Sequence, residues 1–544
     1  MEFFSLSNPH LFIALILSVF NGVLMCFAGY KFLQMIQLSS YKLSGYFLWL
    51  KSDRAKFASR LFMLSFLSSA CILVTNALFS AYKENQYFSY IGIIFYFYFT
   101  IVFTKKMYEA PKKVPLKQTR RMSRLCVMLF LAISVISFYL IAFSSIILPL
   151  YKFGSICLTP LLLIILVPIV HLIMVPFENL NHARYICKAK NKLKKLPNLI
   201  KIGITGSYGK TSCKNILNVI LSQKYQVCIS PHSFNTPMGL TKVVLDYLKP
   251  NHEVLIAEMG ARQRGEIATL CKLINPQHGI LTSVGTQHLL SFGSEENIAQ
   301  GKFELIESLP NQGKAVFNMD NEKSMPLFEK CTNQKFLVSL ENPKANCYAK
   351  NVIVNNEGSN FTLVIGEEEK QCKTSLLGKH NLLNILLCSC FARQLGLEME
   401  QIANAISLLK PVAHRLELIK QNELIILDDS YNASVEGVKA ALEVLNSFDS
   451  KNKIVVTPGL IELGILEEIE NENFGKQIAK VASKVIVVNK TNLSSIKKGL
   501  ISAEFDENNI FEAETLDHAQ IILSSIAEPK SVILFENDLP DNYI

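Results

Sequence analysis

The sequence has no CxxC pair among its 13 cysteines, no internal repeat and no low-complexity tract. The first absence argues against a zinc ribbon or a thioredoxin-like redox site, and the second argues against a solenoid or propeller. Cys388 and Cys390 form a CxC pair on an apolar helical stretch, where packed thiols are expected rather than metal ligands.

Half of the residues of the chain are hydrophobic, and the apolar segments before residue 177 contain almost no charged residues. Any one apolar segment there would also fit a buried core helix, but five in succession predict membrane helices of roughly bilayer-spanning length. The five segments are Leu11–Phe32, Leu61–Tyr82, Tyr87–Thr104, Leu125–Leu148 and Ser155–Val175.

The basic residues of this region gather in alternate loops. The loops after the first and third segments are rich in lysine and arginine, and the second and fourth loops carry little charge. Because short cytoplasmic loops collect Lys and Arg, this pattern predicts a multi-pass protein of the bacterial inner membrane, with its N-terminus outside and everything after Val175 in the cytoplasm. No small-residue cleavage site precedes a soluble domain, which argues against a cleavable signal peptide.

The formal net charge of +10 does not indicate nucleic-acid binding. Most of the excess lies in the basic loops and in the run from Arg184 to Lys195, where anionic lipid head groups would attract it. We therefore expect a lipid membrane as a partner and no nucleic acid. The apolar segments contain few ionisable groups, so there is little sign of a proton or ion path.

Short apolar runs alternate with helical patterns from residue 199 onward, which is typical of a mostly parallel sheet. The runs "LIKIGIT", "EVLIAEMG", "HGILTSVG" and "KAVFNMDN" predict strands, and "ELIILDDS", "KIVVTPG", "KVIVVN" and "SVILFEN" predict a second set after Pro411. The expected fold is an α-helical membrane domain followed by two α/β domains, a P-loop central ATPase domain and a Rossmann-like C-terminal domain. The expected bounds are 1–176 for the membrane domain, 177–198 for a basic linker, 199–410 and 411–544.

The stretch "IGITGSYGKTSCKNIL" places glycines and a lysine between a predicted strand and a predicted helix. It departs from the strict GxxxxGK[ST] pattern because Ile204 stands where the first glycine belongs. The remaining order is still what a phosphate chain requires, since glycines let backbone N–H groups approach, the lysine meets the terminal phosphates and the hydroxyl binds magnesium. This stretch alone does not separate a kinase, a GTPase, a transporter and a ligase.

Several motifs in a fixed order resemble the Mur ligase family over residues 199 to about 465. They are "GITGSYGKTS", "NTPMGLT", "IAEMGARQRGEI", "HLLSFGS", "QGKFELI", "NMDN", "LLGKHNLLN", "HRLELI", "DDSYNAS" and "IELG". "AEMGARQRGEIA", "HNLLN" and "DDSYNAS" are most similar to the branch that adds D-alanyl-D-alanine to a UDP-N-acetylmuramoyl-tripeptide.

The resemblance implies ATP, magnesium and a role for each matching residue. Lys210 would neutralise the β and γ phosphates, Thr211 and Glu258 would hold one magnesium ion, and His288 and Lys302 would support a second if Lys302 carries the carbamate of the family's lysine. The other implied cofactor-binding residues are Gly206, Ser207, Gly209, His380, Asn381, Asn384, Arg415 and Asp429, and the implied substrate residues are Asn235 and Thr236.

The implied activity is an ATP-dependent amide ligase of peptidoglycan precursor synthesis, and so of cell-wall formation and cell shape. ATP would phosphorylate a carboxylate, and an amine, either D-Ala-D-Ala or an amino acid, would attack the acyl phosphate. Two alternatives stay open: a similar ligase acting on another surface polymer or a lipid-linked acceptor, and a nucleotide-binding sensor or transporter subunit.

Two departures from the family bear on the substrate. The positions of the family's UDP-sugar domain are occupied by the apolar segments and the basic linker. The chain also ends in "SVILFENDLPDNYI", where the dipeptide-adding branch continues with a basic, glycine-containing loop. The acidic Glu536, Asp538 and Asp541 fit equally a site that selects a different nucleophile and a solvated tail.

Overall fold

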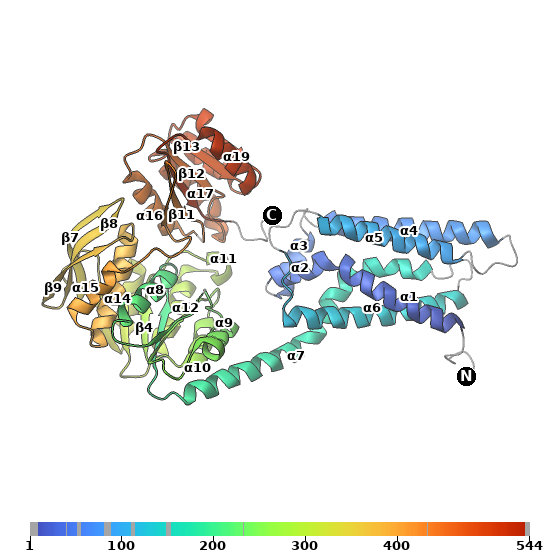
Figure 1. Ribbon diagram of the computed structural model, residues 1–544, viewed down its shortest axis with the longest axis horizontal. Coiled ribbons are helices and arrows are strands. Elements are labelled where there is room, and N and C mark those ends of the chain that lie inside the picture. The colour runs from blue at the N-terminus through green and yellow to red at the C-terminus, as the bar shows by residue number, and fades with distance from the viewer. Residues whose placement is uncertain are drawn as a thin grey trace. The chain divides into compact units, whose positions relative to one another are not determined.

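The computed structural model describes residues 9–39, 41–51, 56–80, 89–109, 115–147, 154–231, 233–431 and 433–538. The chain forms two compact units. Residues 1–182 with 540–544 make up the first unit, and residues 183–539 make up the second. Figure 1 shows helices in the first unit and two sheets with their covering helices in the second.

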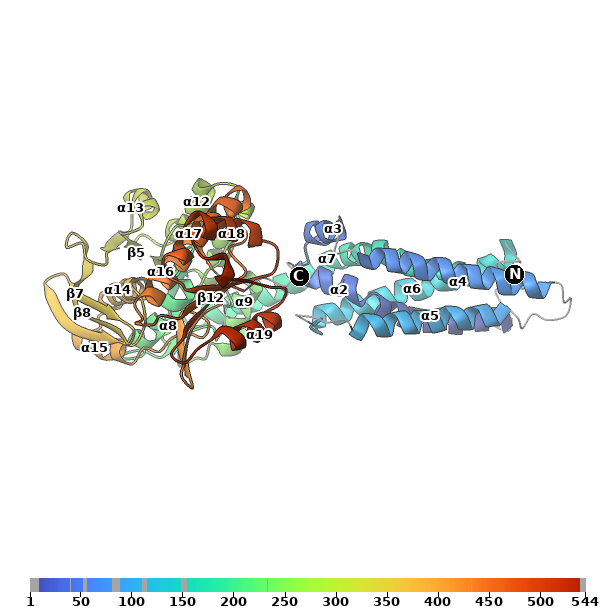
Figure 2. The same ribbon diagram turned by 90° about the horizontal axis from the view of Figure 1, so that it is seen from above.

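The first unit is helical throughout its described residues. Its elements are α1 (Pro9–Ala28), α2 (Tyr30–Leu38), α3 (Leu43–Lys51), α4 (Lys56–Ser80), α5 (Ser89–Glu109), α6 (Arg120–Ile147), the 3-10 turn η5 (Gly154–Leu158) and α7 (Thr159–Lys194). Figure 1 shows α1 beside α6, and Figures 1 and 2 both show α4 beside α5. Helix α7 continues without a break through residues 177–194, for which we expected a linker.

Four described helices, rather than the five expected, are long and apolar enough to cross a membrane by length and composition. They contain the stretches Leu11–Ala28, Arg60–Ala77, Arg120–Ala142 and Ser155–Lys194. The segment expected over Tyr87–Thr104 corresponds to α5, which is not among them; tyrosines and threonines interrupt its apolar residues, and Lys105 and Lys106 lie near its end. The first expected segment is also shorter, because α1 ends at Ala28 and α2 begins after Gly29.

A buried polar network joins four helices of the first unit, α1, α5, α6 and α7. Asn21 of α1 donates from Nδ2 to Ser137 of α6 at 2.9 Å and to Thr159 of α7 at 3.0 Å. The hydroxyl of Tyr96 on α5 donates to Asn21 Oδ1 at 2.7 Å. Buried polar groups are costly unless they are paired, so this network favours one arrangement of the helices over others.

The larger sheet of the second unit has nine strands in the order β2-β3-β1-β4-β5-β6-β7-β8-β9. The first seven in this order pair parallel, and β7, β8 and β9 pair antiparallel. The strands are β1 (Ile200–Thr205), β2 (Val227–Cys228), β3 (Val254–Glu258), β4 (His278–Leu281), β5 (Lys314–Asn318), β6 (Gln334–Val338), β7 (Cys347–Asn355), β8 (Gly358–Ile365) and β9 (Glu368–Thr374).

Helices cover both faces of this sheet, as expected for a parallel sheet with apolar strands. One core lies against α8, α14 and α15, and the other lies against the end of α7 and α9, α10, α12 and α13. The helical elements are α8 (Lys210–Leu221), α9 (Pro237–Lys242), η6 (Val243–Tyr247), α10 (Glu266–Ile274), α11 (Leu289–Phe292), α12 (Glu295–Glu307), η7 (Glu322–Ser324), α13 (Met325–Lys330), α14 (Lys379–Gln394) and α15 (Met399–Ser407).

The second sheet has six strands in the order β10-β11-β15-β12-β13-β14, and only β10 runs antiparallel to its neighbour. All eight strands predicted from the apolar runs are present in the two sheets. The elements of this part are β10 (Glu417–Gln421), β11 (Leu424–Asp429), α16 (Val435–Asn446), β12 (Lys453–Thr457), η8 (Gly464–Leu466), α17 (Glu467–Ala479), β13 (Lys484–Val488), α18 (Leu493–Ser502), η9 (Glu507–Asn509), β14 (Ile510–Ala513), α19 (Leu516–Ile526) and β15 (Val532–Glu536).

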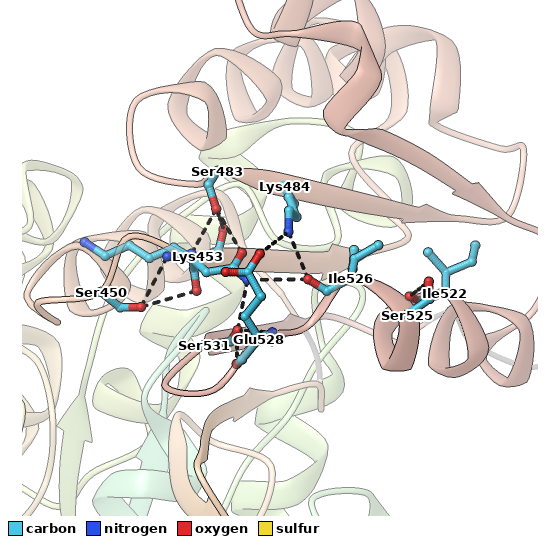
Figure 3. Close-up of polar contacts among 10 residues, drawn as sticks. Ser450, Lys453, Ser483, Lys484, Ile522, Ser525, Ile526, Glu528 and Ser531 are labelled. Carbon is cyan, nitrogen blue, oxygen red and sulfur yellow. Dashed lines mark hydrogen bonds and ion pairs between the residues drawn. The ribbon is translucent and has the colours of Figure 1, made fainter.

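Hydrogen bonds satisfy the polar groups at the amino ends of the central strands of the second sheet (Figure 3). The backbone N–H of Lys453 donates to Ser483 Oγ at 3.0 Å, and that of Glu528 donates to Ser531 Oγ at 2.8 Å. Lys484 Nζ donates to the carbonyl of Ile526 at 2.9 Å and to Glu528 Oε1 at 3.1 Å.

The carboxyl end of the same sheet contains a buried acid without such partners. Glu536 is fully buried at the end of β15, and neither of its carboxyl oxygens has a hydrogen-bond partner among the described residues. It pairs in register with Asp429 of β11, so the two side chains lie on the same face. Burial raises the pKa of Glu536 well above its usual range, and Asp429 raises it further. Glu536 is therefore not part of a solvated tail; Asp541 lies outside the described residues.

We predict that Glu536→Gln stabilises the protein at alkaline pH. A raised folded-state pKa means that the contribution of Glu536 to stability is complete below its unfolded pKa and is lost as the pH rises through the folded pKa. Gln does not ionise, so thermal unfolding of the full-length variant should have a midpoint about 2 °C or more above that of wild type at pH 8. The difference should shrink toward pH 5.

Glu528→Gln is the matched control, because Glu528 is an exposed acid at the other end of the same sheet. Its midpoint should follow that of wild type at both pH values. A Glu536→Gln protein that melts below wild type at pH 8 would contradict the assignment of a buried, costly carboxylate.

Candidate functional site

The phosphate-type loop follows β1, a central strand of the larger sheet, at the edge where parallel strands present their carboxyl ends. Gly206 and Gly209 both have positive φ, of 153° and 80°, and Gly209 directly precedes α8. A Cβ on Gly206 would lie 2.0 Å from Thr282 Oγ1, and one on Gly209 would lie 2.6 Å from Asn384 Oδ1. Both positions therefore require glycine, for conformation and for space.

The segment that follows β4 and helix α14 support this loop. Ser207 accepts a hydrogen bond from the backbone N–H of Gly285 at 2.9 Å, and Ser283 Oγ accepts one from Tyr208 N–H at 3.1 Å. Asn384 of α14 accepts a weak hydrogen bond from the thiol of Cys213 at 3.3 Å. Asn384 thus packs against Gly209 of the loop and Cys213 of α8. The resemblance to the family implies a different role for this residue, a contact with adenine.

Lys210 bends back over the loop. Its Nζ donates to the carbonyl of Gly206 at 2.6 Å and to that of Ser207 at 2.9 Å. Burial lowers its pKa to about 8, although Glu258 opposes this shift. An anion placed against the loop would favour the charged form of this lysine.

Glu258 lies at the end of β3, next to the loop, and is buried. Its Oε1 accepts a hydrogen bond from Thr211 Oγ1 at 3.2 Å and one from Asn235 Nδ2 at 3.1 Å. Its Oε2 faces Lys214 Nζ at 3.4 Å in a buried ion pair. Thr236, the other expected substrate residue, caps α9 by accepting from Gly239 N–H at 3.2 Å.

The donor set of Thr211 and Glu258 suits magnesium. A hydroxyl and a carboxylate oxygen 3.2 Å apart are hard ligands of the kind that Mg²⁺ takes, usually with only one or two carboxylates from the protein. Among the residues that the structure describes, no group of three or more His, Cys, Asp or Glu side chains could hold a metal ion by itself. A bound ion here would therefore need oxygens from a ligand or water.

His288 and Lys302 are not in contact with each other in the described structure. His288 Nδ1 lies 2.6 Å from Glu462 Oε2, and Arg262 pairs with the other oxygen of Glu462 at 3.3 Å. The hydrogen bond from His288 lowers the pKa of Glu462. Arg262 and His288 belong to loops of the larger sheet, and Glu462 lies in the loop between β12 and η8 of the smaller sheet. These contacts therefore join the two α/β parts of the second unit.

Lys302 is buried on α12 and has no carboxylate partner within ion-pair distance among the described residues. Its Nζ lies 3.4 Å from the carbonyl of Ala261 and 5.5 Å from the centre of the Phe292 ring. Burial lowers its pKa well below the usual range, and Lys210 lowers it further. Burial at this position therefore disfavours the charged form of Lys302.

A cavity of about 300 Å³ adjoins α8. Its lining includes Asn215 of α8, Asn381 of α14 and Arg415, so it joins two of the expected nucleotide-binding residues. Asn381 Nδ2 donates to the carbonyl of Leu377 at 2.9 Å. His380 does not line this cavity; its Nδ1 is buried without a hydrogen-bond partner among the described residues, and burial lowers its pKa to about 4.

Arg415 and Asp429 lie close together in the second sheet's domain. The guanidinium of Arg415 covers the ring of Tyr431 at 4.3 Å, and Asp429 accepts a hydrogen bond from Leu416 N–H at 3.1 Å. Burial raises the pKa of Asp429 to about 6, while Arg415 opposes the shift. The expected pair of a cation and a carboxylate is thus adjacent, and Arg415 reaches the cavity beside α8.

The sequence analysis missed Lys214 and Glu462. Lys214 follows Lys210 by four residues, so both lie on one side of α8, and this spacing was a usable signal. Glu462 belongs to the quoted motif "IELG", but nothing in the sequence paired it with His288, 174 positions earlier.

We predict that Gly209→Ala weakens ATP binding at least about tenfold, because left-handed backbone and the clash with Asn384 both oppose the alanine. Binding is measured by fluorescence titration of a labelled ATP analogue. Gly265→Ala is the control, since Gly265 has a similar φ of 86° with nothing within 4 Å of the added Cβ. Equal losses in the two variants would show that Gly209 has no special part in the loop.

Two family descriptions match the chain. Residues 204–392 match the Mur ligase middle domain, and residues 414–536 match the Mur ligase glutamate ligase domain. Together they cover more than half of the chain.

Two relatives and one solved structure show which ligases the chain is similar to. The UDP-N-acetylmuramoyl-tripeptide–D-alanyl-D-alanine ligase of Bacillus subtilis is 33% identical over 280 residues, which is 51% of this chain and 60% of that protein. The ligase of the same name from Escherichia coli is 31% identical over 284 residues, 52% of this chain and 62% of that protein. The MurF ligase of Thermotoga maritima in complex with ADP superimposes with a TM-score of 0.59 at 26% identity, over 66% of this chain and 80% of that structure. The chain thus spans about 60% of the length of these curated relatives.

The comparisons contradict the predicted localisation in the bacterial inner membrane. The matched relatives are named as ligases of a UDP-linked precursor, and both family matches lie outside the apolar helices of the first unit, so the matches give no support to a multi-pass membrane protein. Hydropathy and loop charge describe the composition of a segment, and a buried core helix can have the same composition as a membrane helix.

The chain contains the glycine loop, the buried Glu258 at the end of β3 and Arg415 just before the second sheet. Its two α/β regions both match Mur ligase domains. From residue 204 to residue 536, this protein belongs to the Mur ligase family.

Proposed function

We propose that the chain is an ATP-dependent ligase that joins D-alanyl-D-alanine to the carboxylate of a UDP-N-acetylmuramoyl-tripeptide. The observation that carries the proposal is the contact between Thr211 and the buried Glu258 beside the glycine loop, in a chain 33% identical to a ligase of that name. ATP transfers its γ-phosphoryl group to the carboxylate, the amine attacks the resulting acyl phosphate, and phosphate leaves as the amide forms. Phosphoryl transfer of this kind depends on positioning and charge neutralisation.

The proposed residue roles follow the geometry of the loop. Lys210 turns from the loop carbonyls toward the phosphates, and the N–H groups of the loop and of the first turn of α8 bind phosphate oxygens. Thr211 and Glu258 hold magnesium, which supplies charge neutralisation between the phosphates. Asn235 keeps Glu258 oriented, and Thr236 lies next to it on the substrate side.

The remaining nucleotide contacts come from the cavity beside α8. Asn381 and Arg415 line it, which supports binding of the base and a phosphate there, and Asp429 is suited to a ribose hydroxyl. His380 lies outside this cavity, and we retain it as a candidate contact to the base because its Nδ1 has no hydrogen-bond partner among the described residues. We assign residues 199–410 to a central ATP-binding domain and 411–544 to a C-terminal domain that closes on it, after a helical region at 1–176 and a basic connection at 177–198.

Lys302 is proposed to carry a carbamate that, with His288, supports a second magnesium ion. A buried neutral amine attacks carbon dioxide, a nitrogen–carbon bond forms and one proton leaves to water, so the side chain gains a negative charge. A lysine without a carboxylate partner in a buried position is destabilised as a cation and suited to this reaction.

We predict a protein-bound carbamate signal in the ¹³C NMR spectrum of wild-type protein equilibrated with ¹³C-bicarbonate. Lys302→Ala should remove that signal, and Lys272→Ala, which changes an exposed lysine of the neighbouring helix α10, should retain it. A spectrum that is the same for wild type and Lys302→Ala would exclude the carbamate.

The ligase activity is tested by ADP release from the full-length protein with ATP, magnesium, UDP-MurNAc-tripeptide and D-Ala-D-Ala. We expect turnover that requires both substrates and falls at least about 100-fold in Lys210→Ala, but not in Lys344→Ala at an exposed site. A folded, ATP-binding wild-type protein without turnover would contradict the proposed substrates. A second reaction with a lipid-linked tripeptide acceptor then tests the alternative acceptor, which the unmatched first unit leaves open.

A further inference from the structure

Lys214 is a buried cation in direct contact with the carboxylate that we assign to magnesium. It lies on α8 one turn beyond Lys210 and is 1% exposed. Its Nζ donates to Ser230 Oγ at 3.1 Å and lies 3.4 Å from Glu258 Oε2. The proposed ligase chemistry gives Lys214 no role, although a buried charge is costly to maintain.

The two oxygens of Glu258 have different neighbours. Oε1 receives hydrogen bonds from Thr211 and Asn235, which are neutral groups. Oε2 accepts no hydrogen bond from the described residues, and it faces the ammonium of Lys214 at 3.4 Å. One carboxylate oxygen of Glu258 thus lies beside Thr211, the other proposed magnesium ligand, and its second oxygen lies beside the ammonium of Lys214.

Ser230 fixes the position of that charge. Its hydroxyl lies at the end of the segment that follows β2 and is itself buried, so the ammonium is held between α8 and this segment. A lysine side chain is flexible when it is free, and two anchors restrict it to one position. Glu258 has its own anchors in Thr211 and Asn235, so the pair has little freedom to rearrange.

We propose that Lys214 determines which divalent cation the site accepts. Because Lys214 pairs with Oε2, a metal ion that replaces the hydrogen bonds of Thr211 and Asn235 takes Glu258 through Oε1 alone. Mg²⁺ is small and takes carboxylates one oxygen at a time in octahedral geometry, whereas Ca²⁺ takes more ligands and gains from bidentate carboxylates. The arrangement favours Mg²⁺ over Ca²⁺. This inference rests on the proposed function, because it takes Thr211 and Glu258 as metal ligands.

A purely structural role for the ion pair predicts a different result. If Lys214 only offsets a buried negative charge, its removal changes protein stability and changes the affinities for Mg²⁺ and Ca²⁺ by the same factor. If Lys214 restricts Glu258 to one oxygen, its removal raises the affinity for Ca²⁺ more than that for Mg²⁺. The ratio of the two affinities therefore distinguishes the roles, and it does not depend on turnover.

The experiment measures cation binding to the full-length protein with ADP. Mn²⁺ is bound first and followed by its electron paramagnetic resonance signal, and Mg²⁺ or Ca²⁺ is then titrated as a competitor. Lys214→Met keeps a long side chain and removes the charge. We expect the ratio of Ca²⁺ affinity to Mg²⁺ affinity to rise about tenfold, within the range found when residues that orient a metal ligand are changed.

Lys224→Met is the matched control. Lys224 lies just beyond the end of the same helix, is exposed and donates to the carbonyl of Gly396 at 2.7 Å, away from Glu258. Its ratio should equal that of wild type. Ser230→Ala is the second test variant, because it retains the charge of Lys214 and removes one anchor; we expect a smaller rise in the same direction.

Each outcome decides between the two roles. An unchanged ratio in folded Lys214→Met overturns the proposal, and if that variant does not fold, an unchanged ratio in Ser230→Ala does so. Wild-type protein that binds none of the three cations with ADP would instead exclude the metal site itself, and with it the proposed function. Absence of ligase turnover alone would leave the measured ratio valid.

Discussion

The buried carboxylate of Glu258 connects the main parts of the site. It stands at the end of β3, and its contacts reach the first two turns of α8 and the segment that precedes α9. Because β3 pairs with β1 in register, with Ile204 beside Glu258, the carboxylate is fixed next to the glycine loop by the backbone of the sheet. The position of the proposed metal ligand is therefore a property of strand pairing, which is more rigid than a loop would allow.

The same reasoning explains why the loop needs its neighbours. A glycine loop is intrinsically free, since each glycine loses much conformational freedom on folding. Here the segment after β4 supplies Thr282 and Ser283, and α14 supplies Asn384, and together they leave no space for side chains at Gly206 or Gly209. Support from these two parts of the fold restricts the loop before any nucleotide binds, which reduces the ordering cost of binding.

Much of the fold was predictable because its signals are local. Strands of parallel sheets are short apolar runs, and all eight expected runs form strands. The antiparallel strands β7 to β9 were missed; residues such as Lys350 and Glu369 give β7 and β9 a polar, exposed pattern with less contrast. The apolar helices of the first unit were recognised as helices, but their predicted location was wrong, because the apolar composition of a segment and the charge of its loops do not by themselves determine where a chain resides.

The site was predictable only where a residue's neighbours in the chain reveal its chemistry. Gly209, Lys210 and Thr211 follow one another, so the sequence shows them together. The partner of His288 is Glu462, on a different sheet's domain, and the partner of Lys214 is Glu258, on a different strand. Such pairs arise from the packing of elements that are distant in sequence, and a single sequence contains no direct record of them.

The pair of His288 and Glu462 also shows how the second sheet contributes to a site built mainly on the first. Glu462 lies in the loop that follows β12 at a positive φ of 63°, and it bonds both His288 and Arg262 from the larger sheet's domain. A second metal ion near His288 would compete with Glu462 for the imidazole or would use its other nitrogen. In the first case cation binding would release this contact between the domains, and only then would the state of the His288–Glu462 pair be coupled to occupancy of the site; in the second case the contact would stay in place.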